Sequence, residues 1–241
     1  HMTMLRSEKV KKENELKEYL NANGGFSNSM IGSESSIFNI NVFDESLMAA
    51  IDRFSSFFAA PLMLRESMWR GIMAVELEFQ EIVNDDDQRI EQLLASKAAC
   101  VASNFSCGNR KSLTEDVGSE KLYEAAREFR NKFYVASNMF LCIQSGRSLD
   151  RLQETTEEFF SGIPSGSMPK QLDPVPIEDH FTADFFTKML YVKPKGEECK
   201  LYMTFVMPSM LNHYKTKPHI FLKDVIGHEG AGSLSSYLRE K

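Results

Sequence analysis

The chain has 241 residues, of which 42% are hydrophobic and 26% are charged, and its formal net charge is −6. This composition is that of a soluble globular protein with enough chain to bury a core in one large or two modest domains. The negative charge and the lack of a concentrated basic stripe argue against nucleic acid as the main partner. No apolar run approaches membrane-spanning length, so we expect no membrane partner and, by default, a cytoplasmic location.

Helices and short strands alternate in the first hundred residues. In chain order we expect a helix over 11–20, strands over 27–31 and 36–42, a helix from Asp44 to Phe58 and a long helix that begins at Arg65. Asp44 is the expected N-cap of its helix, and Pro61 separates that helix from the long one. Residues 84–87 (NDDD) either continue the long helix toward Ala102 or mark a kink in it.

The front of the long helix, from Arg65 to Glu81, carries an apolar stripe at helical spacing. The members of the stripe are Met68, Ile72, Val75, Phe79 and Ile82. Glu78 lies on its flank, where we expect solvent to reach it less freely, and Gly71 lies two turns earlier on the same face. An acid in such a place is more often paired or turned to water than bound to a metal.

The second half of the chain repeats the alternation. We expect a loop at 105–109, a helix over 120–134 with Phe129 inward, a buried strand over 139–143 and a helix from the Ser148 cap to about Phe160. Further along, we expect paired strands over 187–192 and 201–206 and a helix over 217–226. A glycine-rich break at 227–234 then precedes a last helix. The whole succession predicts an α+β fold, a layered mixed sheet with packed helices.

The domain organisation is predicted from a change in composition. Four prolines and two glycines give residues 162–178 the composition of a linker. We therefore expect a first domain over 1–164, a linker over 165–178 and the beginning of a second, similar domain over 179–241.

Familiar catalytic patterns are missing or weak. No Ser-His-Asp or Cys-His arrangement can be identified by spacing, and no GxxxxGK[ST] or GxGxxG loop is present. His228-Glu229 could suggest zinc, but a zinc helix needs two histidines one turn apart, so a glycine-rich turn is the simpler interpretation. The four cysteines form no CxxC pair and are interpreted as reduced thiols, with Cys142 inside the apolar strand.

Seven separated stretches together resemble one peptidase family. In chain order they are ENELKEYL (13–20), GGFSNS (24–29), DRFSSFFAAPL (52–62), AVELE (74–78), Gly108-Asn109, FSGIP (160–164) and IGHEGAGSLSSYL (226–238). Their order and spacing are similar to the insulinase/pitrilysin-type inverted-zincin metallopeptidases, in particular the branch like insulin-degrading enzyme and nardilysin.

The resemblance implies four related α+β domains around a chamber for peptides, with this chain forming most of the first and the opening part of the second. It implies peptide hydrolysis by a zinc ion held by two His of an HxxEH helix and a distant Glu, while the Glu of the motif activates water. Glu78 matches the distant Glu ligand. The matching substrate-binding positions are Asn28 and Ser29 on an edge strand used for strand addition, and Gly227, His228 and Glu229 near the exosite that captures a peptide's N-terminal end.

The chain departs from the family pattern at its beginning and around Glu78. It contains no HxxEH, and the expected position of the motif is at or before its first residues. Residues 2–13 align without a gap to the segment that follows the motif, which would put His1 on its second histidine; His1 is either part of the real site or a cloning remnant that coincides with it. Gly71 stands where active members carry a supporting Glu, and Phe79 where some carry His or Tyr.

Two functions are consistent with this pattern. The first is a fragment of an insulin-degrading-enzyme-like zinc metalloendopeptidase, with the isolated chain inactive because Glu78 alone cannot hold zinc tightly. The second is a catalytically dead paralogue that binds peptides or supports an active subunit; a general α+β binding module is a third, blander possibility. The expected partners are peptide substrates and the remaining domains of the parent, and an incomplete second domain favours self-association.

Overall fold

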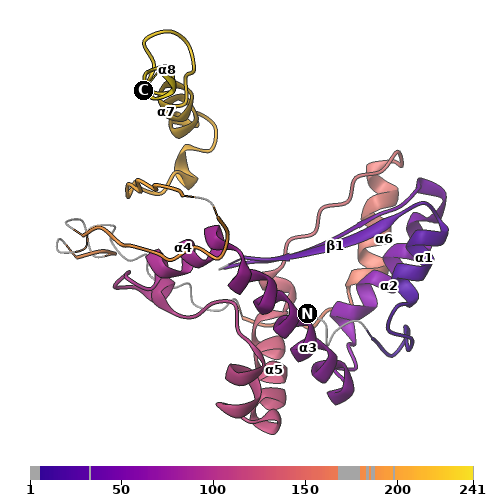
Figure 1. Cartoon of the computed structure of the whole chain (residues 1–241). Helices are drawn as coiled ribbons and strands as arrows, with labels where there is room; N and C mark the ends of the chain where they lie inside the picture. Colours follow the sequence, from indigo (N-terminus) through magenta and orange to yellow (C-terminus); the bar gives the residue numbers. More distant parts are fainter. Residues whose placement is uncertain are drawn as a thin grey trace. The chain divides into compact units, whose positions relative to one another are not determined.

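The computed structural model describes residues 6–32, 34–167, 180–182, 185, 188–197 and 199–240. The chain forms two compact units, unit 1 with His1–Ser96 and Asn104–Pro174, and unit 2 with Lys97–Ser103 and Val175–Lys241 (Figure 1). Among the described residues, no helix combines the length and the apolar character needed to cross a membrane.

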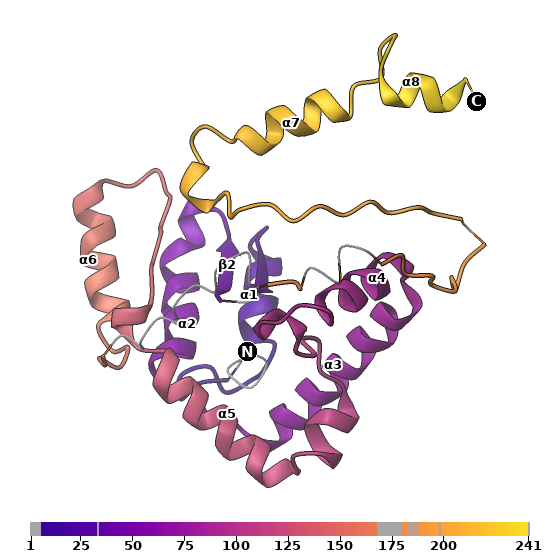
Figure 2. The ribbon, with the colours of Figure 1, turned by 90° about the vertical axis from the view of Figure 1, so that its left-hand side faces the viewer.

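Unit 1 is an α+β arrangement built from six helices and one hairpin in its described residues. The elements are α1 (Glu15–Ala22), β1 (Phe26–Ile31), β2 (Ser36–Asn41), α2 (Leu47–Ala59), α3 (Arg65–Asn84), α4 (Asp86–Ala95), α5 (Ser119–Phe133) and α6 (Leu149–Phe160). β1 and β2 pair antiparallel, from Phe26 opposite Asn41 to Ile31 opposite Ser36. α1 lies against β1 and α2, and α6 lies beside α2 (Figure 2).

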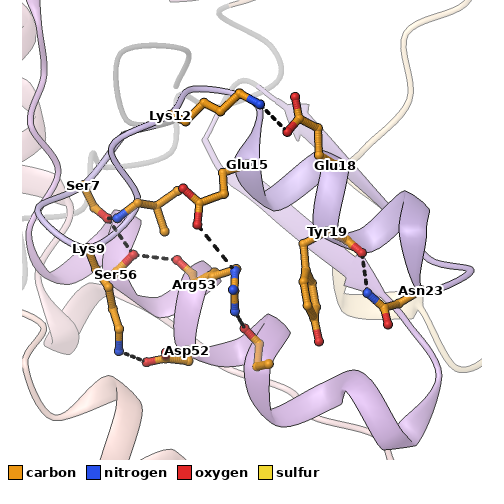
Figure 3. Close-up of polar contacts among 12 residues, drawn as sticks. Ser7, Lys9, Lys12, Glu15, Glu18, Tyr19, Asn23, Asp52, Arg53 and Ser56 are labelled. Carbon is orange, nitrogen blue, oxygen red and sulfur yellow. Dashed lines mark hydrogen bonds and ion pairs between the residues drawn. The ribbon is translucent and has the colours of Figure 1, made fainter.

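The segment before α1 is fastened to α2, as Figure 3 shows, and to the connection between α2 and α3. Ser7 is fully buried, and its hydroxyl lies 2.8 Å from that of Ser56 and accepts from the Val10 N–H at 2.9 Å. The Leu62 N–H donates to the Arg6 carbonyl at 2.9 Å, and Lys9 pairs with Asp52. The segment therefore has a fixed path across unit 1 before the first helix begins.

The core of unit 1 lies between α1, α2 and the hairpin. Its buried members are Val10, Leu16, Leu20, Ala50 and Phe57, and Tyr19, Ile40, Val42 and Phe54 pack against them. Phe58 is also buried and meets the rings of Phe54 and Phe38 edge to face, at 5.1 and 5.3 Å between centroids. The buried face of α2 consists of Ala50, Ile51, Ser55, Phe57 and Phe58.

The acidic cluster at 84–87 is a kink. Asp85 has extended backbone angles, and its carboxylate accepts from the N–H groups of Asp87 and Gln88. It is therefore the N-cap of a new helix, α4, and the long helix ends at Asn84. Asp44, predicted as an N-cap, instead begins a 3₁₀ turn (Asp44–Ser46) before α2, and its carboxylate accepts from the Ser145 hydroxyl at 2.6 Å.

Three predicted strands are wrong for the described residues. Residues 139–143 are neither a strand nor buried: Phe140 is fully exposed, and Leu141 and Cys142 are exposed too. Residues 188–192 and 201–206 contain no strand either, while Thr187 lies outside the described residues. Apolar composition alone does not make a strand, because the backbone also needs a neighbouring strand to pair with.

The remaining predicted elements are present, although α1 begins at Glu15 rather than at residue 11 and one side chain on α5 differs. α5 matches the helix expected at 120–134, but Phe129 on it is exposed. Ser148 caps α6, accepting from the Arg151 N–H. Unit 2 contains α7 (Pro218–Ile226), α8 (Leu234–Arg239) and short 3₁₀ turns at Val101–Ser103 and Leu211–His213.

Replacing Leu20 tests the core of unit 1. Leu20 is completely buried, so Leu20→Ala leaves a cavity and should lower the free energy of unfolding by about 2–5 kcal/mol. Chemical denaturation measures the change, with Lys17→Ala on the exposed face of the same helix expected to stay within about 0.5 kcal/mol of wild type. Equal effects of the two substitutions would show that this core is not the source of stability.

Candidate functional site

α3 carries Glu78, the zinc ligand that the resemblance implies, but the surroundings of Glu78 differ from those expected from the sequence. Met68 and Ile72 are buried, and the later members of the stripe are only half-buried. Glu78 is exposed, so the expectation of restricted solvent access is wrong. The buried residues of α3, Ser67, Met68 and Ile72, all lie in its N-terminal half, and Glu78 follows them by more than a turn.

An ion-pair network ties the first turns of α3 to the segment before α1. Arg6 donates to Glu66 at 2.6 Å and lies 3.5 Å from the Glu13 carboxylate. Arg70 binds Glu13 and also donates to the hydroxyl of the buried Ser67 at 3.1 Å. Gly71 directly follows Arg70, so the network ends at the position where the resemblance expects a supporting acid.

Residues 104–110, which we name the α3 loop, pack on the C-terminal half of α3. The Arg110 N–H donates to the Glu76 carboxylate at 2.7 Å, and the Gln80 side-chain amide donates to it at 2.8 Å. These two hydrogen bonds, the backbone one first, lower the pKa of Glu76 below its ordinary value. Phe105 meets Phe79 edge to face, with 5.8 Å between centroids.

The turn of the α3 loop depends on Gly108 and Asn109. Gly108 has φ +75°, and a Cβ placed there would lie 3.6 Å from Val75. The Asn109 side chain accepts from the Ser112 N–H at 2.8 Å while the Ser112 hydroxyl accepts from the Asn109 N–H at 3.0 Å. This reciprocal cap leads into a short π-helical turn, Lys111–Glu115.

Cys107 lies in the α3 loop within electrostatic reach of Glu78. Burial is the larger cause, and the negative charge of Glu78 the smaller, of a raised pKa for the Cys107 thiol. The thiol therefore stays protonated at neutral pH and is a poor nucleophile and metal ligand. All four cysteines are free thiols.

The predicted substrate residues Asn28 and Ser29 lie on β1 beside a pocket of about 260 Å³. Leu16 and Lys17 of α1, Phe54, Phe57 and Phe58 of α2, and Phe38 and Asn39 of β2 also line this pocket. The Asn28 side-chain carbonyl accepts from the Ser29 N–H at 2.9 Å. Among the described residues, β1 has β2 as its one neighbouring strand.

Gly227, His228 and Glu229 lie together in unit 2, in the loop between α7 and α8. Gly227 ends α7, its N–H donating to the Lys223 carbonyl at 2.8 Å. The exposed Glu229 carboxylate lies 3.1 Å from Arg239 of α8. A Cβ on Gly230 would come within 2.5 Å of the His228 ring, so glycine there lets the ring fold over the backbone.

The structure thus places the predicted residues in three groups: Glu78 on α3, Asn28 and Ser29 on β1, and residues 227–229 in unit 2. His1 lies outside the described residues. In the described part of the chain, no three His, Cys, Asp or Glu side chains gather in a way that could hold a metal ion.

Sequence reasoning missed the contacts of the α3 loop with α3. Glu76 stands two residues before Glu78 in the AVELE stretch, and its role depends on a backbone group 34 residues away. Gly108-Asn109 was the available signal, because a Gly-Asn pair inside a loop is typical of a tight turn that must be held in place.

Solved structures define the class of fold. A crystal structure of pitrilysin superimposes with a TM-score of 0.68 and 27% sequence identity, covering 76% of this chain and 19% of that one. A protease from Helicobacter pylori shares the fold with a TM-score of 0.63 at 14% identity, over 73% of this chain and 43% of that one. The fold is that of the domains of pitrilysin-type metallopeptidases.

Sequence comparison identifies the family. The family described as Insulinase (Peptidase family M16) matches residues 1–104, and the Peptidase M16 inactive domain matches residues 121–241. Nardilysin of Rattus norvegicus is 33% identical over all of this chain and 21% of its own length, and the A-factor-processing enzyme of Saccharomyces cerevisiae is 32% identical over all of this chain and 24% of its own. The chain belongs to the insulinase family of peptidases, and it spans between a fifth and a quarter of the length of these relatives.

Gly108 provides a test of the α3 loop. Gly108→Ala forces a side chain into left-handed backbone geometry, which should lower the free energy of unfolding by about 1–2 kcal/mol. Gly146→Ala is the matched control, because no atom lies within 4 Å of the added Cβ and the backbone is not left-handed. Denaturation curves in which both variants equal wild type would contradict the strained turn.

Proposed function

We propose that the chain is part of a zinc metalloendopeptidase like insulin-degrading enzyme, in which Glu78 is the third zinc ligand. The observation that carries the proposal is the insulinase-family match over residues 1–104, which includes α3 and Glu78. Another relative, from Schizosaccharomyces pombe, is named a putative zinc protease and is 33% identical over nearly the whole chain. The exposed position of Glu78 leaves its carboxylate open to further ligands.

The residues of this chain do not by themselves make a zinc site. Glu78 is a single carboxylate, whereas catalytic zinc has three protein ligands and an open position. We therefore propose that the two histidines come from an HxxEH segment, of which His1 is the only candidate member in this sequence. When bound, zinc would polarise the peptide carbonyl and activate water.

We propose that β1 binds a peptide by adding it as a further strand. The Gly32 N–H donates to the Ser35 carbonyl at 2.7 Å and closes the hairpin, so alternation along the ladder directs the backbone of Ser29 away from β2. The Asn28 side chain holds the Ser29 N–H and would have to release it to an incoming strand. Backbone pairing of this kind binds peptides with little sequence preference.

In unit 2 we propose that Gly227, His228 and Glu229 take the N-terminal end of a peptide. An exposed carboxylate in a glycine-rich loop suits an ammonium group, and the ion pair that Glu229 forms with Arg239 is itself exposed. The domain organisation is part of the same proposal. It consists of a first domain over 1–164, a linker over 165–178 and a partial second domain over 179–241, and the two domains have the layered sheet of the family.

A catalytically dead paralogue is the alternative function. Gly71 stands where active members carry a supporting acid, and Arg70 beside it is engaged with Glu13. A parent without that acid and without HxxEH would keep the peptide-binding strand and lose the hydrolysis.

The purified chain should contain well under one zinc ion per molecule, since one carboxylate binds the metal weakly. Elemental analysis after dialysis measures the content, and an internally quenched peptide should remain uncut. One tightly bound zinc per chain would refute this expectation.

Glu78→Gln in the longer protein, with the sequence upstream of residue 1 included, separates the two functions. An active parent should lose its zinc and at least about 100-fold in kcat/KM, because a ligand matters more than the outer partners whose loss costs 10–100-fold. Glu81→Gln, on the same helix, should leave both unchanged. A longer protein that binds peptides without zinc or hydrolysis would support the dead paralogue.

We also propose that the isolated chain self-associates through α7. Several large apolar side chains of this helix are exposed, namely Ile220, Phe221, Leu222, Val225 and Ile226. A cluster of exposed large apolar side chains is typical of a surface that binds a protein partner.

Light scattering over a concentration series should show a mass that rises above the monomer value. Phe221→Asp should lower that rise, while Thr216→Asp adds the same charge just before α7 and should not. A monomer at every concentration would contradict the proposal.

A further inference from the structure

The α3 loop is held on α3 by side chains that follow one another along a single helical turn. Val75 contacts the position of Gly108, Glu76 binds the Arg110 N–H, and Phe79 meets Phe105. Glu78 lies inside this turn. Cys107 of the α3 loop lies within electrostatic reach of Glu78, so whatever fixes the loop also fixes this neighbour of Glu78.

Glu76 is the polar member of this attachment. Its two carboxylate oxygens are both used, Oε2 by the Arg110 N–H at 2.7 Å and Oε1 by the Gln80 amide at 2.8 Å. The bond to Gln80 is an ordinary contact one turn along the helix. The bond to Arg110 is not, because it joins segments 34 residues apart and gives a backbone donor a charged acceptor.

We propose that Glu76 is a positioning residue, whose carboxylate fastens the α3 loop to α3 and thereby sets the surroundings of Glu78. Gln80 orients the carboxylate, and the contacts of Gly108 and Phe105 guide the loop to the same face. Groups behind a metal ligand hold it in the geometry that binding needs. The importance of this role for zinc rests on the proposed function of Glu78, whereas the attachment of the loop does not.

The arrangement also separates two neighbouring acids by task. Glu76 is half-buried and turned to the α3 loop, while Glu78, two residues later, is exposed. A spacing of two residues places them on different faces of the helix. Glu76 can therefore attach the α3 loop to α3 while the carboxylate of Glu78 remains accessible to solvent.

Amide hydrogen exchange followed by NMR on the full chain tests the attachment. Glu76→Ala should raise exchange at the Arg110 amide at least tenfold, with the amides of α3 still protected. Glu76→Gln keeps an acceptor oxygen without the charge and should fall between wild type and the alanine variant, which makes it the conservative rescue. Glu81→Gln removes an exposed acid of the same helix and should match wild type.

The side-chain carboxyl ¹³C resonance of Glu78 tests the positioning. It should shift in Glu76→Ala and remain in place in Glu81→Gln. Unchanged Arg110 exchange in Glu76→Ala, or an equal rise in Glu81→Gln, would overturn the attachment. Faster exchange with an unmoved Glu78 resonance would overturn the positioning role. Since neither measurement involves metal, a longer protein that fails to bind zinc would refute only the proposed function.

Discussion

Ser7 is buried against α2, where its hydroxyl lies within hydrogen-bond distance of the Ser56 hydroxyl and accepts from the Val10 N–H. A buried hydroxyl without partners would be destabilising, so this site is stable only when both segments are in place. Val10 then enters the core beside Leu20. The path of residues 6–16 thus fixes α1 against α2, and through Arg6 and Glu13 it also fixes the first turns of α3.

The two halves of α3 differ in how they are packed and held in place. Its N-terminal half buries one face, with Ser67, Met68 and Ile72, and is held by ion pairs, which at an exposed surface contribute little individually and more as a network. Its C-terminal half is covered on one face by the α3 loop and open on another. The kink at Asp85 ends the helix soon after Glu78, and so the acid lies near the end of a rigid element whose other end is anchored.

The helices could be predicted from sequence because their signals are local. The spacing of apolar residues predicts the buried Met68 and Ile72 of α3, and Ser148 predicts the start of α6. The prediction of a strand at 139–143 failed because a strand requires a partner and composition does not reveal whether one is present. The exposure of Glu78 and the hydrogen bond from Arg110 to Glu76 depend on contacts between segments far apart, which no spacing within α3 encodes.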